Sequence, residues 1–146
     1  LSPYVFCSVL CQFGTHLVVL VQACRWGIAH DLGAPPEADG DFEPSVVNTV
    51  VWLVSTAMLI TTFAVNYKGK PYMEALASNK GLLYSIGASA LLIAALTLGA
   101  LTELAEYLGL VPLPSPELRS DLLALMAADF CVSYAAEKLL SKLFRY

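Results

Sequence analysis

The sequence predicts an all-α, polytopic membrane protein with four transmembrane helices and both chain ends in the cytosol. Composition is the first reason, since 58% of the 146 residues are hydrophobic and only 14% are charged. Soluble domains carry roughly 45–50% apolar and 25% charged residues. The second reason is that four apolar stretches are each long enough to cross a bilayer core, which needs about 20 helical residues. The third is the uneven distribution of charge between the two ends of these stretches.

The four predicted spans form one helical bundle that covers residues 1–146. Proline and capping residues mark where they begin. Pro44 suits the first turn of a helix, where its missing N–H costs nothing, and Ser115 precedes Pro116 as a helix cap. Ser78 or Asn79 is expected to cap the third span. The predicted spans are residues 3–28, 44–67, 82–104 and 118–144.

The basic residues predict the orientation in the membrane. Six of the eight Lys and Arg residues fall in the second connection and at the C-terminal end, which an even number of crossings places on one side. Most acidic residues fall in the first and third connections, and Arg25 and Arg119 are exceptions near that side. Positive charge favours the cytosol, so both chain ends are predicted to be cytosolic. The six basic residues are Lys68, Lys70, Lys80, Lys138, Lys142 and Arg145.

The first span carries polar residues on one helix face, at Ser8, Gln12, Thr15 and His16. A polar face would be costly against lipid, so we expect it to point at other helices. It could line a path for an ion or a substrate, but hydrogen bonding between helices is the preferred interpretation.

Asp129 lies near the middle of the fourth span, where an acid is costly unless it is paired or protonated. Counted from the cytosolic ends, the depths of His16 and Asp129 differ by only about 5 Å at 1.5 Å per residue. We therefore expect Asp129 to accept a hydrogen bond from His16 or Gln12. Asn48, near the start of the second span, is expected to bond to local backbone or to a neighbouring helix.

The sequence carries no motif for covalent chemistry. A glycine-rich phosphate loop, a nucleophile elbow and a zinc signature are all missing from it. The four cysteines are expected to be packing residues. A basic patch with interleaved aromatic residues is also missing, so no nucleic-acid partner is predicted. No catalytic, cofactor-binding or metal-binding residue is therefore predicted in this segment.

Several stretches resemble the last four transmembrane helices, seven to ten, of the type-five-A P-type ATPases. These enzymes are the transmembrane-helix dislocases of the endoplasmic reticulum. The most specific stretch runs from Asn66 to Glu74, where an apolar span ends in Asn-Tyr-Lys-Gly-Lys-Pro. The first span contributes only Gln12-Phe13 and His16. The other matching stretches are residues 42–50, 62–65, 79–80, 108–112 and 129–131.

The resemblance implies a multi-pass protein of the endoplasmic reticulum membrane that uses ATP and Mg²⁺ to extract misinserted transmembrane helices. It places the phosphorylated aspartate and the nucleotide-binding domain outside this segment, whose helices would support the moving part of the membrane domain. Partners would be the bilayer, the remaining helices and cytosolic domains of the same chain, and transmembrane-helix substrates. The sequence does not begin with Met, which favours a piece of a longer protein. An independent four-helix accessory subunit, or the same region of another P-type cation pump, are the alternatives.

Overall fold

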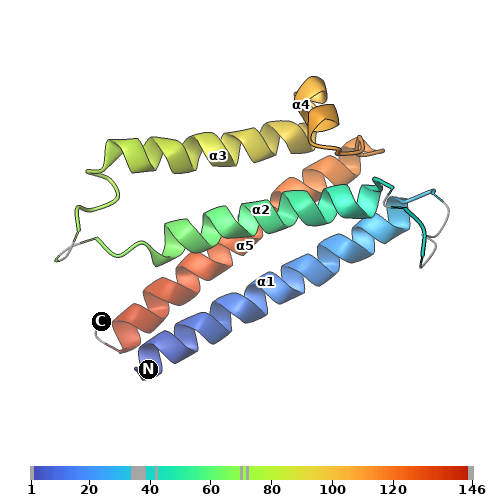
Figure 1. Ribbon diagram of the computed structural model, residues 1–146. Coiled ribbons are helices and arrows are strands. Elements are labelled where there is room, and N and C mark those ends of the chain that lie inside the picture. The colour runs from blue at the N-terminus through green and yellow to red at the C-terminus, as the bar shows by residue number, and fades with distance from the viewer. Residues whose placement is uncertain (1, 34–38, 42, 70, 72, 145–146) are drawn as a thin grey trace.

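The computed structural model describes residues 2–33, 39–41, 43–69, 71 and 73–144, and these residues form helices joined by irregular segments (Figure 1). No strand occurs in this part of the chain, so the all-α prediction is confirmed. Lys70 and Arg145, two of the six basic residues that predict the orientation, and Phe42, the first residue of the matching stretch 42–50, lie outside the described residues. The helices are α1 (Pro3–His30), α2 (Val46–Asn66), α3 (Lys80–Leu98), α4 (Thr102–Tyr107) and α5 (Pro116–Leu143).

Side-chain caps begin the four long helices. Ser2 and Ser45 accept hydrogen bonds from backbone N–H groups three residues later, at 3.3 and 3.2 Å. Asn79 caps α3 and Ser115 caps α5 in the same way, both at 3.1 Å. These caps satisfy N–H groups that the first turn of a helix leaves without a partner. The capping predicted at Asn79 and Ser115 is confirmed.

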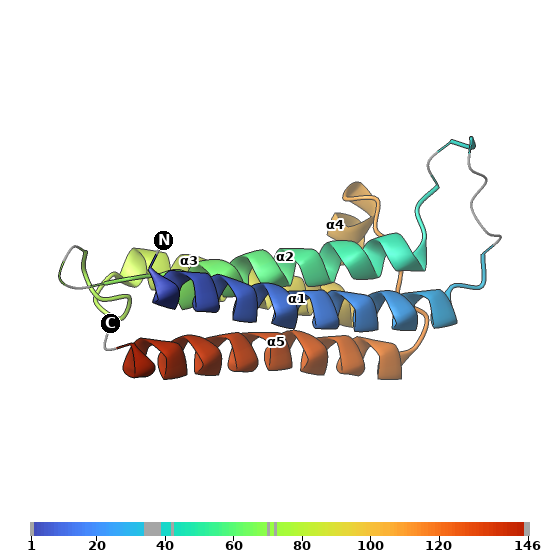
Figure 2. The same ribbon diagram turned by 90° about the horizontal axis from the view of Figure 1, so that it is seen from below.

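Helices α1, α2 and α5 form the centre of the bundle, and each packs against the other two. Helix α3 packs against α2 and α5, and the short α4 lies beside the end of α3 (Figure 1). Both chain ends and the α2–α3 connection lie at one end of the bundle (Figure 2). An even number of membrane crossings would place both chain ends on one side, which agrees with this arrangement. The assignment of that side to the cytosol rests on the distribution of charged residues alone.

The apolar core occupies the half of the bundle that lies away from the chain ends. Its central members are Ala23 near the end of α1, Val50 near the start of α2 and Leu122 near the start of α5, all without exposed surface. Gly27 lets α1 approach α2 closely, since a Cβ atom there would lie 3.3 Å from the Cα of Val47. The main cluster of buried apolar side chains therefore lies in one half of the bundle.

The third predicted span, residues 82–104, is wrong at its C-terminal end, because α3 ends at Leu98. Gly99 adopts φ 76°, a left-handed conformation that ends helices and that glycine adopts without steric cost. The next N–H, of Ala100, bonds back to the carbonyl of Ala95 at 2.9 Å. The guanidinium of Arg119 donates to the Leu98 carbonyl at 3.0 Å and to the Leu113 carbonyl at 2.8 Å.

We expect Gly99→Ala to lower the free energy of unfolding by about 1–2 kcal/mol, the cost of a left-handed conformation for a residue with a Cβ atom. The added Cβ would also lie 3.0 Å from the Arg119 guanidinium and would push it from the two carbonyls. The measurement is reversible unfolding of the whole protein in mixed detergent micelles. Gly87→Ala is the matched control, because a Cβ at Gly87 meets nothing within 4 Å; equal losses in the two variants would contradict this account.

Three of the described helices, α1, α2 and α3, are long and apolar enough to cross a membrane. Helix α5 is as long as α1, but it is not apolar enough to count as a candidate membrane span. Charged residues along α5, including Arg119, Asp121 and Asp129, lower its apolar character. The outer face of α1, by contrast, exposes a row of large apolar side chains, as expected of a helix in contact with lipid or other helices. They are Phe6, Val9, Leu10, Phe13, Leu17, Val18 and Val21.

Candidate functional site

A polar network fills the other half of the bundle, between α1, α2 and α5. On α1 and on α5 its members recur every four residues, which keeps them on one helix face. The two helices run in opposite directions (Figure 1). Hydrogen bonds join their polar faces, Tyr4 and Ser8 to Glu137 and His16 to Asp129. The hydrogen-bonded residues are Tyr4, Ser8, Gln12 and His16 on α1, Thr62 and Asn66 on α2, Lys68 after α2, and Asp129 and Glu137 on α5. The buried Ser133 lies between these two acids on the same face of α5.

Glu137 is the centre of the network at the end of the bundle that holds the chain termini. Its carboxylate accepts hydrogen bonds from the Tyr4 hydroxyl, from Ser8 at 2.5 Å and from the Lys68 ammonium at 2.7 Å. The same ammonium lies 4.7 Å from the centre of the Tyr4 ring and bonds to its hydroxyl. Glu137 is only 6% exposed. A buried carboxylate with three donors is stable only while those donors remain, because an unpaired charge in the interior is costly.

Lys68 lies just after the end of α2, and its side chain is 57% exposed. Partial burial works to lower its pKa, but hydrogen bonds with Glu137 and Tyr4 outweigh that effect, so the pKa is raised. Its ammonium group is therefore charged at neutral pH. The raised pKa also means that its contribution to stability is lost only as the pH rises through alkaline values.

Two amides join α1 to α2 in the middle of the network. Gln12 donates to the Asn66 carbonyl oxygen at 3.0 Å, and Asn66 donates to the Gln12 carbonyl oxygen at 2.8 Å. Gln12 also donates to Ser8 at 3.0 Å. Asn66 makes a further bond to the backbone carbonyl of Thr62 at 2.8 Å. Paired amides satisfy each other's donors and acceptors. Gln12 is buried and Asn66 is exposed, so the pair joins α1 to α2 at the edge of the bundle.

His16 and Asp129 form the deepest part of the network. Nδ1 of His16 lies 2.7 Å from Oδ1 of Asp129, and Nε2 lies 3.1 Å from the Thr62 hydroxyl. The predicted contact between Asp129 and His16 is thus present. Asp129 is 2% exposed, and its second carboxylate oxygen has no hydrogen-bond partner among the described residues. The hydroxyl of Ser133, one turn further along α5 and fully buried, is also unpartnered in this part of the chain.

The other polar residues singled out from sequence lie outside the network. Asn48 is exposed at the opposite end of α2, where its backbone N–H bonds to Ser45. Thr15 donates to the Cys11 carbonyl of its own helix at 2.9 Å. The four cysteines are free thiols. Among the described residues, no group of three or more His, Cys, Asp or Glu side chains is placed to hold a metal ion.

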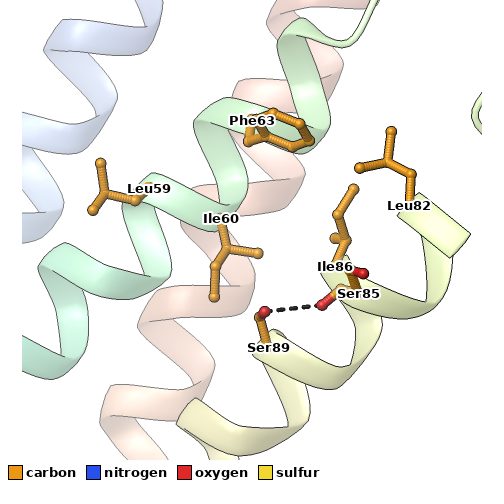
Figure 3. A pocket seen from close by; sticks show the side chains of 7 residues that line it. All are labelled: Leu59, Ile60, Phe63, Leu82, Ser85, Ile86 and Ser89. Atoms are coloured by element: carbon orange, nitrogen blue, oxygen red, sulfur yellow. Dashed lines mark hydrogen bonds between the residues drawn. The ribbon is translucent and has the colours of Figure 1, made fainter.

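A shallow apolar groove of about 300 Å³ runs between α2 and α3 (Figure 3). Its two hydroxyl groups bond within α3, Ser85 to the Gly81 carbonyl at 2.9 Å and Ser89 to the Ser85 carbonyl at 2.8 Å. Both hydroxyls are therefore satisfied without a ligand, and the remaining surface is hydrocarbon. The lining residues are Leu59, Ile60, Phe63, Leu82, Ser85, Ile86 and Ser89.

Glu137, Lys68, Asn66, Tyr4, Thr62 and Ser133 were not identified as site residues from the sequence. A signal for two of them existed, because Asp129, Ser133 and Glu137 repeat the four-residue spacing of Ser8, Gln12 and His16. Only the antiparallel packing of α1 and α5 shows that the two series face each other. The position of Lys68 depends on how the chain leaves α2, which helical spacing does not predict.

A bundle of apolar helices around a polar network defines the class as a segment of a polytopic membrane protein. Comparison with known proteins identifies its relatives, although no protein-family model matches the chain. The chain is 36% identical over 139 residues to a probable manganese-transporting ATPase of Arabidopsis thaliana. The aligned region covers 95% of this chain and 12% of that protein. It is 34% identical over 146 residues to an endoplasmic reticulum transmembrane helix translocase of Schizosaccharomyces pombe, 99% of this chain and 12% of that protein. A translocase of the same name from Aspergillus fumigatus is 30% identical over 147 residues, 98% of this chain and 11% of that protein.

The chain is therefore homologous to one stretch of the type-five-A P-type ATPases, the endoplasmic reticulum transmembrane helix translocases, as its sequence motifs implied. It spans only 11–12% of the length of these relatives. Together with the three candidate spans, the relatives support a multi-pass location in the endoplasmic reticulum membrane.

Proposed function

We propose that this segment is the C-terminal support bundle of an ATP-driven translocase that extracts misinserted transmembrane helices from the endoplasmic reticulum membrane. The observation that carries the supporting role is the internal polar network. Its hydrogen bonds join α1 to α2 and α1 to α5, and Lys68, just after α2, bonds to Glu137 of α5, so these helices are held as one unit. A rigid unit of this kind suits a support for parts that move during an ATP-driven cycle. The names of the relatives support the translocase activity.

We infer that α5 is a fourth membrane crossing, although it is less apolar than the other three long helices. Its two buried acids are both paired, Asp129 with His16 and Glu137 with Lys68. Pairing lowers the cost of charged groups in a membrane helix. Helix α5 also packs against α1 and α2, which are candidate spans of similar length. With four crossings, both chain ends lie on the same side, and the basic residues favour the cytosol.

The first experiment tests the translocase activity on the whole protein, purified and reconstituted in lipid. We expect ATP with Mg²⁺ to form an acid-stable phosphoaspartate, and we expect a hydrophobic transmembrane peptide to stimulate ATP hydrolysis. One relative is named as a probable manganese-transporting ATPase, so manganese transport is the second candidate. Stimulation by Mn²⁺ in place of the peptide would favour that function. Absence of the phosphoenzyme would overturn both, and would favour a small accessory subunit.

A second experiment tests the supporting role itself. A photo-crosslinking amino acid is placed at Phe63 in the groove between α2 and α3, and separately at Phe13 on the outer face of α1. We expect neither position to crosslink to a substrate helix during ATP turnover. ATP-dependent crosslinking at either position would show that this bundle contacts the substrate.

A further inference from the structure

We propose that His16 and Asp129 form a proton-binding site inside the bundle, which takes up one proton from the water at the Lys68 end. This inference goes beyond the proposed translocase function and does not depend on which substrate the whole protein moves.

The unpartnered oxygen of Asp129 is the first observation. Oδ1 of Asp129 contacts His16, but Oδ2 is buried without a hydrogen-bond partner among the described residues. A buried carboxylate oxygen that only accepts hydrogen bonds is costly to leave unpaired. A proton on Oδ2 removes the negative charge and turns that oxygen into a donor. The Ser133 hydroxyl, buried and unpartnered one turn away on the same face of α5, is the nearest candidate acceptor along the helix.

The charge balance of the network is the second observation. Lys68 and Glu137 form an ion pair that is neutral overall. The deeper pair carries one negative charge when His16 is neutral and Asp129 is ionised, and none after one proton is bound. Within α2 no side chain titrates, so no nearby cation on that helix offsets the charge. Within the network around this pair, the other titratable groups are Tyr4 on α1, Lys68 after α2 and Glu137 on α5. Helix α3 adds the exposed Lys80 and Tyr84. The remaining charged residues of α1 and α5 lie outside the network: Arg25 and His30 on α1, and Glu117, Arg119, Asp121, Lys138 and Lys142 on α5.

The hydrogen bonds of His16 suit both protonation states. When Asp129 is ionised, Nδ1 of His16 donates to it and Nε2 accepts from the Thr62 hydroxyl. If the extra proton is on the imidazole instead, Nε2 donates and the Thr62 hydroxyl accepts. The proton can therefore be shared between the two side chains without loss of either contact. In the step an O–H bond of a hydronium ion breaks, an N–H or O–H bond forms on the pair, and a water molecule is left.

The distribution of polar groups identifies the end from which the proton enters. From His16 toward the chain termini, polar side chains of the network recur at every helical turn, about 18 Å along α1 to Tyr4. In the opposite direction the interior is the apolar core around Ala23, Val50 and Leu122. The hydrogen-bonded network that reaches His16 and Asp129 therefore extends toward the Lys68 end of the bundle.

The test is infrared difference spectroscopy of the whole protein in lipid nanodiscs, between alkaline and acidic buffer. A protonated carboxyl group has a C=O stretching band that an ionised carboxylate lacks. We expect wild type and Asp121→Asn to show such a band for a buried carboxyl, and Asp129→Asn to lose it. Asp121 is the matched control, because it is an exposed aspartate two turns earlier on α5. A band that persists unchanged in Asp129→Asn would overturn the proposal.

His16→Gln provides a second measurement that remains informative if Asp129→Asn does not fold. Glutamine can still donate a hydrogen bond to Asp129 but cannot take up a proton. We expect the band to remain and its pH midpoint to move, because the pair no longer shares the proton. An unchanged midpoint would overturn the proposal, since His16 would then be no part of the site.

Discussion

Replacing Glu137 with alanine is expected to lower the free energy of unfolding by about 3 kcal/mol, the lower end of the range for breaking a buried ion pair. Three donors lose their acceptor at once: the Tyr4 hydroxyl, the Ser8 hydroxyl and the Lys68 ammonium. The loss should not be larger, because the Lys68 side chain is 57% exposed and can turn toward water. Reversible unfolding of the whole protein in mixed detergent micelles measures the effect.

Two further variants make this prediction specific. Glu106→Ala removes an exposed glutamate of α4, outside the network, and is expected to change stability by less than about 0.5 kcal/mol. Glu137→Gln keeps the shape of the side chain and one acceptor oxygen but removes the charge, and is expected to fall between wild type and Glu137→Ala. Equal stability of Glu137→Ala and Glu106→Ala would show that the network at the Lys68 end does not hold the helices together.

The sequence predicted the starts of α3 and α5 well because each begins at a capping side chain. The start of the second span at Pro44 was wrong by two residues, because Ser45 caps α2 and the helix begins at Val46. Asn79 and Ser115 both cap helices as expected, and apolar runs of sufficient length follow them. The end of α3 was predicted too late, because Ala100 to Leu104 continues the apolar composition. The left-handed Gly99 ends the helix there, and Arg119, from a helix that begins later in the chain, bonds to the Leu98 carbonyl at this end.

The deepest pair of the network was predictable, whereas the rest of the network was not. Depth alone brings His16 and Asp129 to the same level, since both lie at a known number of residues from a membrane edge. Glu137 lies near the end of α5 beside Lys138 and Lys142, where a charged residue usually faces water. Glu137 is buried because α1 and α2 pack close to it and because the Lys68 ammonium lies over the Tyr4 ring.

The apolar core and the polar network lie in different halves of the bundle, so the two halves are expected to differ in how easily their helices separate. Hydrogen bonds between membrane helices contribute only about 0.6 kcal/mol on average, and rarely more than about 1.7. Close packing at the other end does not depend on protonation. Loss of the charge on Glu137 is therefore expected to loosen the half with the chain ends, while the half around Leu122 stays packed.

Leu122→Ala tests that packed half, and we expect it to lower the free energy of unfolding by about 2 kcal/mol. Leu122 has no exposed surface and lies among side chains of α1 and α2 in the apolar core. When membrane helices separate, Leu122 becomes surrounded by lipid, which is as apolar as leucine itself. The free energy of moving its side chain from the core into lipid is therefore small. The lost contacts around the cavity remain, because neighbouring helices close such a space only in part.

Leu139→Ala is the matched control for this variant, since it removes the same atoms from the same helix at a side chain that is 68% exposed. It is expected to change stability by less than about 0.5 kcal/mol. The two halves should also respond independently. Because Leu122 and Glu137 lie about 22 Å apart along α5 at 1.5 Å per residue, the losses in the double variant Leu122→Ala, Glu137→Ala should add. A double variant much less unstable than the sum would show that the apolar core and the polar network unfold as one unit.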